Sequence, residues 1–188
     1  MRKRIATALL GLVGWATEGE LPPFKKAVVI AAPHTTNWDG IFLVLVANAM
    51  GARFAWIGKD SLFRGPFGWI FYRMNGVPID RRGRQSMVEQ MAAHFESRDE
   101  LLLAIAPEGT RKLRPHWRSG FYHIATTAKV PIVCGYLDYK RRRGGIGPTI
   151  HPTGNPIEDM GRIREFYADI TGKYPNDFGP IRLKEEIE

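Results

Sequence analysis

The residues of this sequence that could carry out chemistry lie in two short polar segments, each directly after an apolar run. The first runs from Ala31 to Gly40 and places His34 five positions before Asp39. A histidine takes a proton near neutral pH, and a carboxylate bound to its other ring nitrogen fixes the tautomer and stabilises the imidazolium. Since side chains five apart do not meet on a continuous helix, this pair needs a turn that leads into a helix. His34 is then a candidate general base; the alternative is a hydrogen-bonded structural histidine.

The second polar segment, Pro-Glu-Gly-Thr-Arg, carries groups suited to an anionic ligand. Its last residue, Arg111, has a planar guanidinium that matches phosphate. Gly109 allows close approach to the backbone, and Thr110 adds a hydroxyl. Arg81 and Arg82, at the end of another predicted strand, could converge on the same edge.

The sequence has no motif for a nucleophile that would form a covalent enzyme intermediate. It has no Gly-x-Ser-x-Gly elbow, and its single cysteine, Cys134, lies in an apolar run without a polar neighbour. If His34 is a base, its target hydroxyl therefore belongs to the substrate, and the group is transferred directly. Because His-Glu-x-x-His and Cys-x-x-Cys patterns are also missing, we predict neither a metal site nor a cofactor.

Apolar patterning predicts one α/β domain with a largely parallel or mixed central sheet flanked by helices. Continuous apolar runs predict strands, and apolar residues at helical spacing predict the helices between them. The expected strands cover 27–32, 53–58, a short run from 75, 101–106, 130–137 and a return strand at 148–151, and the helices cover 41–50, 85–97, 120–129 and 158–171. This alternation indicates a parallel sheet with an antiparallel edge, and both polar segments then lie at one edge of it.

The charge of the chain suggests a polyanionic partner. The 188 residues carry a formal net charge of +8. A nucleic acid, an anionic lipid surface or a phosphorylated substrate would each suit that charge. We find no nucleic-acid recognition motif and no basic helix, so a nucleic acid is not expected.

The N-terminal segment 1–17 begins with Arg-Lys-Arg and continues without charge. It is too short to span a bilayer, which takes roughly 20 apolar residues. We expect a short amphipathic helix on the membrane surface, followed by one domain over 18–188. A signal peptide and an ordinary helix packed on the core are the alternatives. The aromatic-rich segment 62–73 also suits a membrane interface, although core packing is favoured there.

Four segments together resemble the motifs of the glycerolipid acyltransferase family, whose best-known members are 1-acylglycerol-3-phosphate acyltransferases. Residues 34–39 match its His-x4-Asp motif, and 76–81 (Gly-Val-Pro-Ile-Asp-Arg) resemble the second motif, whose arginine is a phosphate ligand. Residues 107–111 resemble the third motif, which helps to bind the acceptor, and 130–133 (Val-Pro-Ile-Val) resemble the fourth. The four occur in the family's order and with family-like spacing, across most of the chain.

This resemblance implies transfer of a fatty acyl group from an acyl thioester, either acyl-CoA or acyl carrier protein, to the hydroxyl of a lysophospholipid. The leading acceptor is 1-acylglycerol-3-phosphate, in phospholipid biosynthesis. His34 would be the general base and Asp39 would orient it. The substrate-binding residues would be Arg81, Glu108, Gly109, Thr110 and Arg111. The enzyme would be peripheral, at the cytoplasmic face of an anionic membrane.

Three other functions stay open at this point. The acceptor could be another lipid, such as an amino-acid lipid or a glycolipid, because Pro33, Thr36 and Arg118 differ from residues common in the family. The protein could be a thioesterase that uses His34 on water. It could also be a basic membrane-binding module without catalysis, which the charge of +8 would suit.

Overall fold

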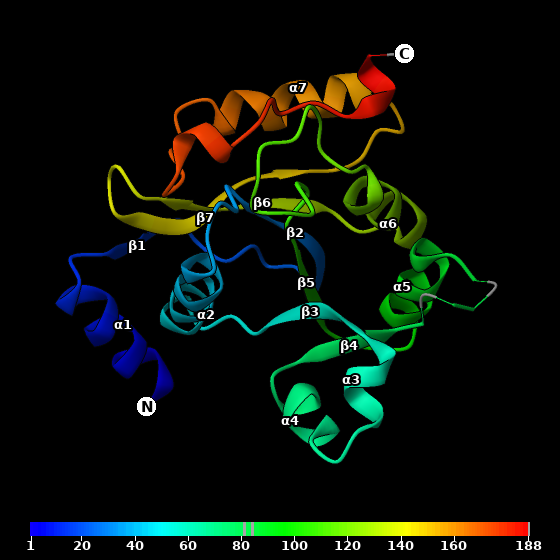
Figure 1. Ribbon diagram of the computed structural model, residues 1–188, viewed down its shortest axis with the longest axis horizontal. Coiled ribbons are helices and arrows are strands. Elements are labelled where there is room, and N and C mark those ends of the chain that lie inside the picture. Colours follow the sequence, from blue (N-terminus) through cyan, green and yellow to red (C-terminus); the bar gives the residue numbers. More distant parts are fainter. Residues whose placement is uncertain (81, 84, 188) are drawn as a thin grey trace.

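A seven-stranded sheet forms the centre of the computed structural model, which describes residues 1–80, 82, 83 and 85–187 (Figure 1). The strands are β1 (Ala16–Glu18), β2 (Lys26–Ala32), β3 (Phe54–Lys59), β4 (Gly76–Ile79), β5 (Leu101–Ile105), β6 (Ile132–Asp138) and β7 (Arg143–Ile150). Their order is β1-β7-β6-β2-β5-β3-β4. Neighbouring strands are parallel except β6 and β7, which are antiparallel.

Helices cover both faces of this sheet. On one face lie α5 (Met87–Glu96), α6 (Gly120–Ala128) and α7 (Pro156–Tyr167), and on the other lie α1 (Arg2–Leu12) and α2 (Trp38–Met50). The short helices α3 (Asp60–Arg64) and α4 (Gly68–Arg73) lie beside β4, and short 3-10 turns at Pro175–Asp177 and Lys184–Glu186 follow α7. In the part of the chain that the structure describes, no helix is long and apolar enough to cross a membrane.

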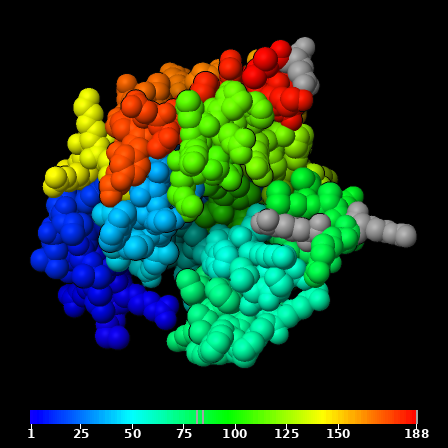
Figure 2. Space-filling model, viewed as in Figure 1, coloured from blue at the N-terminus to red at the C-terminus, as the bar shows by residue number. Residues whose placement is uncertain are grey.

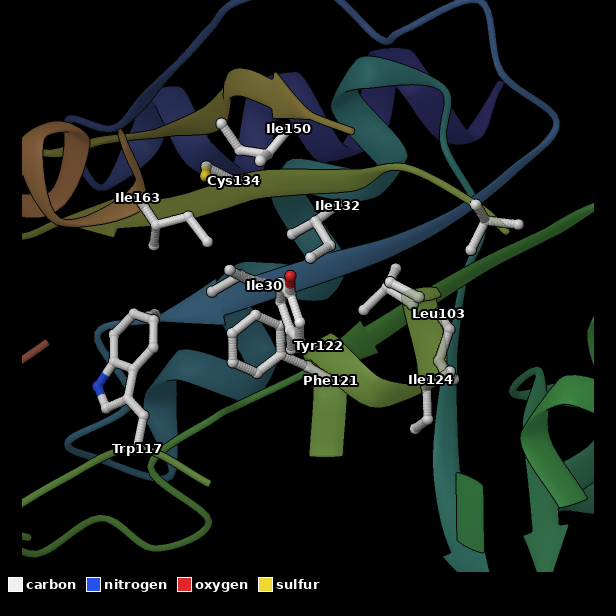
Figure 3. Close-up of a cluster of buried hydrophobic side chains, with 14 of the residues drawn as sticks. Ile30, Leu103, Trp117, Phe121, Tyr122, Ile124, Ile132, Cys134, Ile150 and Ile163 are labelled. Carbon is white, nitrogen blue, oxygen red and sulfur yellow. The ribbon is translucent and has the colours of Figure 1, made fainter. Parts of the chain in front are cut away.

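The main core lies between the sheet and the helices α5, α6 and α7. In β2, Val28 and Ile30 face this core, while Ala27 and Val29 belong to a second cluster on the other face. Figure 3 shows Ile30 beside Phe121 of α6. Because helices cover both faces, the central strands are apolar on both sides. This packing fixes β2, the strand that leads to His34.

Local sequence signals set several helix ends. Ser86 and Glu89 form a capping box at the start of α5: the Ser86 hydroxyl accepts from the Glu89 amide at 3.2 Å, and the Glu89 carboxylate accepts from the Ser86 amide at 2.8 Å. Helix α2 ends at Met50, and the φ of 88° at the following Gly51 lies in the left-handed region that glycine adopts readily.

The predicted fold class, one α/β domain with a largely parallel sheet, is confirmed. Strand β1 was not predicted, and β7 begins at Arg143, before the expected return strand at 148–151. Strand β1 has only three residues, none of them buried, and β7 begins with Arg-Gly-Gly, so neither segment shows an apolar pattern. A Cβ on Gly145 would lie 1.9 Å from the carbonyl oxygen of Glu18, so the close pairing of β1 with β7 depends on a glycine there.

Two segments expected near a membrane differ in detail from the prediction. Helix α1 ends at Leu12, and residues 16 and 17 belong to β1, so the segment 1–17 contains both a helix and part of a strand. In the segment 62–73, core packing holds for Phe63, which is 7% exposed. The prediction of core packing is wrong for Phe67 and Trp69, which are 66% and 64% exposed.

Candidate active site

The two polar segments meet at the carboxyl-terminal edge of two adjacent parallel strands. β2 leads to His34 and β5 leads to Glu108, and Ile30 of β2 pairs with Ile105 of β5. From β2 the chain continues through α2 on one face of the sheet, and from β5 it continues through α6 on the other (Figure 1). Connections that leave neighbouring strands over opposite faces create a crevice at the strand ends, where α/β proteins bind ligands.

The predicted His34–Asp39 pair forms in the turn that starts α2. Asp39 lies in the first helical turn, and its Oδ2 is 3.2 Å from Nδ1 of His34. The same oxygen accepts the backbone N–H groups of Thr35 at 2.7 Å and Thr36 at 2.8 Å. Two side chains five positions apart therefore meet as expected, through a turn that leads into a helix. The His34 side chain is 28% exposed and that of Asp39 only 5%, so the candidate base is accessible and its partner is buried.

The contacts of Asp39 keep it ionised. Burial acts to raise its pKa, but hydrogen bonds from His34, Tyr139 and two backbone amides outweigh burial and hold the pKa below its ordinary value. The Tyr139 hydroxyl donates to Oδ1 of Asp39 at 2.6 Å. A carboxylate at Nδ1 leaves Nε2 of His34 to accept a proton and stabilises the imidazolium that results.

Glu108 lies behind the candidate base. Its Oε1 accepts the backbone N–H of His34 at 2.9 Å, and its side chain is buried. Burial raises the pKa of Glu108 to about 7, although hydrogen bonds from backbone amides oppose the shift. Its Oε2 is buried and has no hydrogen-bond partner among the described residues. Glu108 therefore fixes the backbone that carries His34, and its predicted contact with an acceptor stays a prediction.

The rest of the second segment lines a cavity beside His34. Nη1 of Arg111 donates to Oδ1 of Asn37, which ties the two polar segments together. Thr110 lines the same cavity. Gly109 has a φ of 64°, and a Cβ there would lie 2.7 Å from Nε of Arg118. Glycine therefore leaves room for the Arg118 side chain, and Arg111 and Arg118 both line the cavity.

The predicted phosphate ligand Arg81 lies outside the described residues. Its neighbour Arg82 places Nη2 3.8 Å from Oδ2 of Asp60, and the same oxygen lies 2.9 Å from Arg64. Asp60 is buried at the start of α3. These ion pairs connect the chain after β4 to α3.

The cavity has a volume of about 810 Å³, within the usual range for ligand sites of roughly 300–1,000 Å³. Figure 2 shows this face hollowed between the light blue segment that contains α2 and the cyan segment that follows β3. Its lining includes the polar side chains of His34, Asp39, Thr110, Arg111 and Arg118 and the apolar side chains of Leu43, Trp56, Ile57, Met87 and Phe121. Cationic and apolar side chains in one cavity suit an amphiphile with an anionic head. Among the described residues, no group of three or more His, Cys, Asp or Glu could hold a metal ion.

Comparison with known proteins identifies the family. The model of the Acyltransferase family matches residues 16–137, more than half of the chain. This chain belongs to the Acyltransferase family. A 1-acyl-sn-glycerol-3-phosphate acyltransferase of Haemophilus influenzae is 28% identical over 193 aligned positions, which cover 94% of this chain and 78% of that protein. A probable 1-acyl-sn-glycerol-3-phosphate acyltransferase of Mycoplasma pneumoniae is 30% identical over 141 positions, 63% of this chain and 49% of the relative.

A solved structure shares the fold of this acyltransferase. The crystal structure of the 1-acyl-sn-glycerophosphate (LPA) acyltransferase PlsC from Thermotoga maritima superimposes with a TM-score of 0.58. The match covers 87% of this chain and 73% of that one, at 17% sequence identity. At this identity the likeness concerns the fold, and it agrees with the α/β architecture predicted from the sequence.

Sequence analysis of this acyltransferase missed Tyr139 as part of the site. Tyr139 is separated from Asp39 by 100 positions, and no local pattern connects them. It also lies beyond the segment 16–137 that the family model matches. One signal was present: Tyr139 directly follows β6, which lies beside β2, so its backbone had to emerge at the same edge of the sheet as His34.

Proposed function

We propose that this acyltransferase moves a fatty acyl group from acyl-CoA or acyl carrier protein to the free hydroxyl of a lysophospholipid, with 1-acylglycerol-3-phosphate as the leading acceptor. It would thereby act in phospholipid biosynthesis. The observation that carries the proposal is the accessible His34, paired with buried Asp39, at a cavity lined by both cationic and apolar side chains. The names of the two relatives favour the same acceptor.

The chemistry is a direct acyl transfer. Nδ1 of His34 is bound to Asp39, so Nε2 takes the proton from the acceptor hydroxyl as its oxygen attacks the thioester carbonyl carbon. The tetrahedral intermediate collapses, its C–S bond breaks, and the thiolate leaves with the proton that His34 had taken. The products are an ester and a free thiol. Backbone amides near the two polar segments are our candidates for stabilising the oxyanion.

The two guanidiniums in the cavity wall suit the phosphate of the acceptor. Arg111 presents a planar donor fork, and its hydrogen bond to Asn37 orients it beside the His34 turn. Arg118 packs over Gly109 and lines the same cavity. Arg81 is a further proposed ligand, from its place in the second family-like motif. The apolar lining residues, among them Leu43 and Trp56, would contact the acyl chain.

Exposed apolar side chains support peripheral attachment to an anionic membrane at its cytoplasmic face. On α1, Ile5 is 53% and Leu12 is 83% exposed, and Ile5 directly follows the cationic start Arg2 to Arg4. On α4, Trp69 is 64% and Tyr72 is 55% exposed. Helices α1 and α4 both lie at the lower side of the view in Figures 1 and 2, so a single membrane surface could contact both helices. Contiguous exposed apolar side chains commonly mark interaction sites, and nearby cations favour anionic lipid.

The deciding experiment measures thiol release from palmitoyl-CoA by the purified protein in detergent, with and without lysophosphatidic acid, beside the His34→Ala variant. Release that needs both the acceptor and His34 would establish acyl transfer. Release that needs His34 but no acceptor would identify a thioesterase. If neither occurs, the same assay with acyl carrier protein, and then with amino-acid lipids and glycolipids as acceptors, tests the remaining substrates. Inactivity throughout would leave a membrane-binding protein without catalysis.

A further inference from the structure

We propose that Tyr139 is a positioning residue of this enzyme, which holds the carboxylate of Asp39 in the rotation that His34 needs. The Tyr139 hydroxyl donates to Oδ1 of Asp39 at 2.6 Å. The other oxygen, Oδ2, faces His34 and accepts the amides of Thr35 and Thr36. The two carboxylate oxygens thus have different partners: Oδ2 contacts the base, and Oδ1 accepts the tyrosine hydroxyl. The kinetic part of this inference rests on the proposed function.

The division of the two oxygens matters because the terminal torsion of an aspartate is soft. Rotation about that bond would move Oδ2 away from Nδ1 of His34. Among the described residues, Tyr139 supplies the one hydrogen bond to Oδ1. Asp39 is only 4% exposed, so water has little room to replace the tyrosine. Without the hydroxyl, a buried carboxylate oxygen would lose its partner.

Several elements hold the ring of Tyr139 in place. Trp15, just after α1, lies edge-on at 5.0 Å between ring centroids, and Phe42 of α2 lies at 5.9 Å. Trp15 and Phe42 also contact each other at 4.4 Å. The backbone N–H of Tyr139 donates to the carbonyl of Thr171, after α7, at 2.9 Å. The ring is therefore fixed by segments from both ends of the chain.

The hydroxyl of Tyr139 keeps its proton and stays a donor. Burial and the neighbouring charge of Asp39 raise its pKa far above the ordinary value for tyrosine. Tyr139 is absent from the residues that line the cavity, so it acts through Asp39 rather than on the substrate. A hydrogen-bonded partner behind a reacting pair commonly changes turnover, because it orients the group that does the chemistry.

The test is a double-mutant cycle of Tyr139→Phe with Asp39→Asn. We expect Y139F to lower kcat about ten-fold or more, as outer hydrogen-bond partners commonly do, with the KM for the acceptor within about two-fold of wild type. In the D39N background, Y139F should cause no further loss. A wild-type kcat in Y139F, or an equal loss in both backgrounds, would overturn the proposal.

The matched control is Tyr122→Phe. Tyr122 is buried and, like Tyr139, donates to a buried carboxylate, in this case Oδ2 of Asp159 at 2.8 Å, which is also absent from the residues that line the cavity. Y122F removes the same kind of hydrogen bond, so it should lower the melting temperature and leave kcat unchanged. If Y139F does not fold, Trp15→Leu loosens the ring and keeps the hydroxyl. W15L should lower kcat less than Y139F would, and this loss should also vanish in the D39N background. An equal loss of kcat from W15L in the D39N background would count against the proposal.

A second readout does not depend on turnover and so separates this inference from the proposed function. Nitrogen NMR of labelled histidine at about pH 8, where an ordinary histidine is neutral, reports which ring nitrogen of His34 carries the proton. We expect the proton on Nδ1 in wild type and Y122F, and a mixture of tautomers in Y139F. If wild type transfers no acyl group to lysophosphatidic acid but Y139F still shows the mixture of tautomers, only the acceptor assignment is refuted. An unchanged tautomer in Y139F would refute the role of Tyr139.

Discussion

Replacing Glu108 by glutamine should change how the stability of this acyltransferase depends on pH. The carboxyl is buried and accepts the His34 amide, and burial raises its pKa from an ordinary 4.5 to about 7. A carboxyl whose pKa is higher in the folded than in the unfolded state binds more protons when folded. Its contribution to stability is therefore fully present below pH 4.5 and is lost as the pH rises through about 7.

The size of this effect follows from the two pKa values. The difference between 4.5 and about 7 corresponds to about 3 kcal/mol of unfolding free energy. Glutamine keeps an oxygen for the His34 amide but cannot ionise. Near pH 5 the unfolding free energy of E108Q should thus differ from that of wild type only by a constant offset. Near pH 8 E108Q should be more stable relative to wild type by up to about 3 kcal/mol beyond that offset.

Urea denaturation at several values between about pH 5 and pH 8 measures this difference. The control is Glu100→Gln, because Glu100 is 71% exposed and pairs with the equally exposed Lys25 at 3.4 Å. E100Q should follow the wild-type curve over the whole range. Parallel curves for E108Q and wild type would show that the buried carboxyl does not titrate in this window, and the reasoning from burial would be wrong.

Substitutions in the site and on the surface test three further roles. His34→Ala should keep the fold and lose about 10²- to 10⁴-fold in kcat, the usual cost of a general base; an unchanged rate in a folded variant would remove the mechanism. Arg111→Ala should raise the acceptor KM roughly ten-fold or more with kcat nearly kept, whereas the same change at Arg114, exposed outside the cavity wall, should not. Leu12→Glu should weaken binding to anionic vesicles roughly ten-fold in sedimentation, while Leu113→Glu, also at an exposed leucine, should not; equal binding by both would exclude α1 as the membrane contact.

The sequence by itself determined the class of fold and the central pair of the site. Apolar runs such as 27–32 are buried on both faces of the sheet, so their composition alone predicts central strands. The pair His34 and Asp39 is a local feature, because one turn and the start of α2 bring the two side chains together. The two residues lie within six consecutive positions, so motif spacing was enough to predict their contact.

Only the tertiary structure decided what surrounds that pair. Tyr139 reaches Asp39 across 100 positions, and Glu108 reaches the backbone of His34 across 74. The sequence suggested that Glu108 would hold the acceptor, and the folded chain adds a contact that no spacing indicated, between its carboxylate and the backbone amide of His34. The exposed aromatic side chains of α4 also escaped prediction, because Phe and Trp suit a core and a surface equally well. Partners far apart in the chain are set by how strands and helices pack, and no spacing in the sequence encodes that.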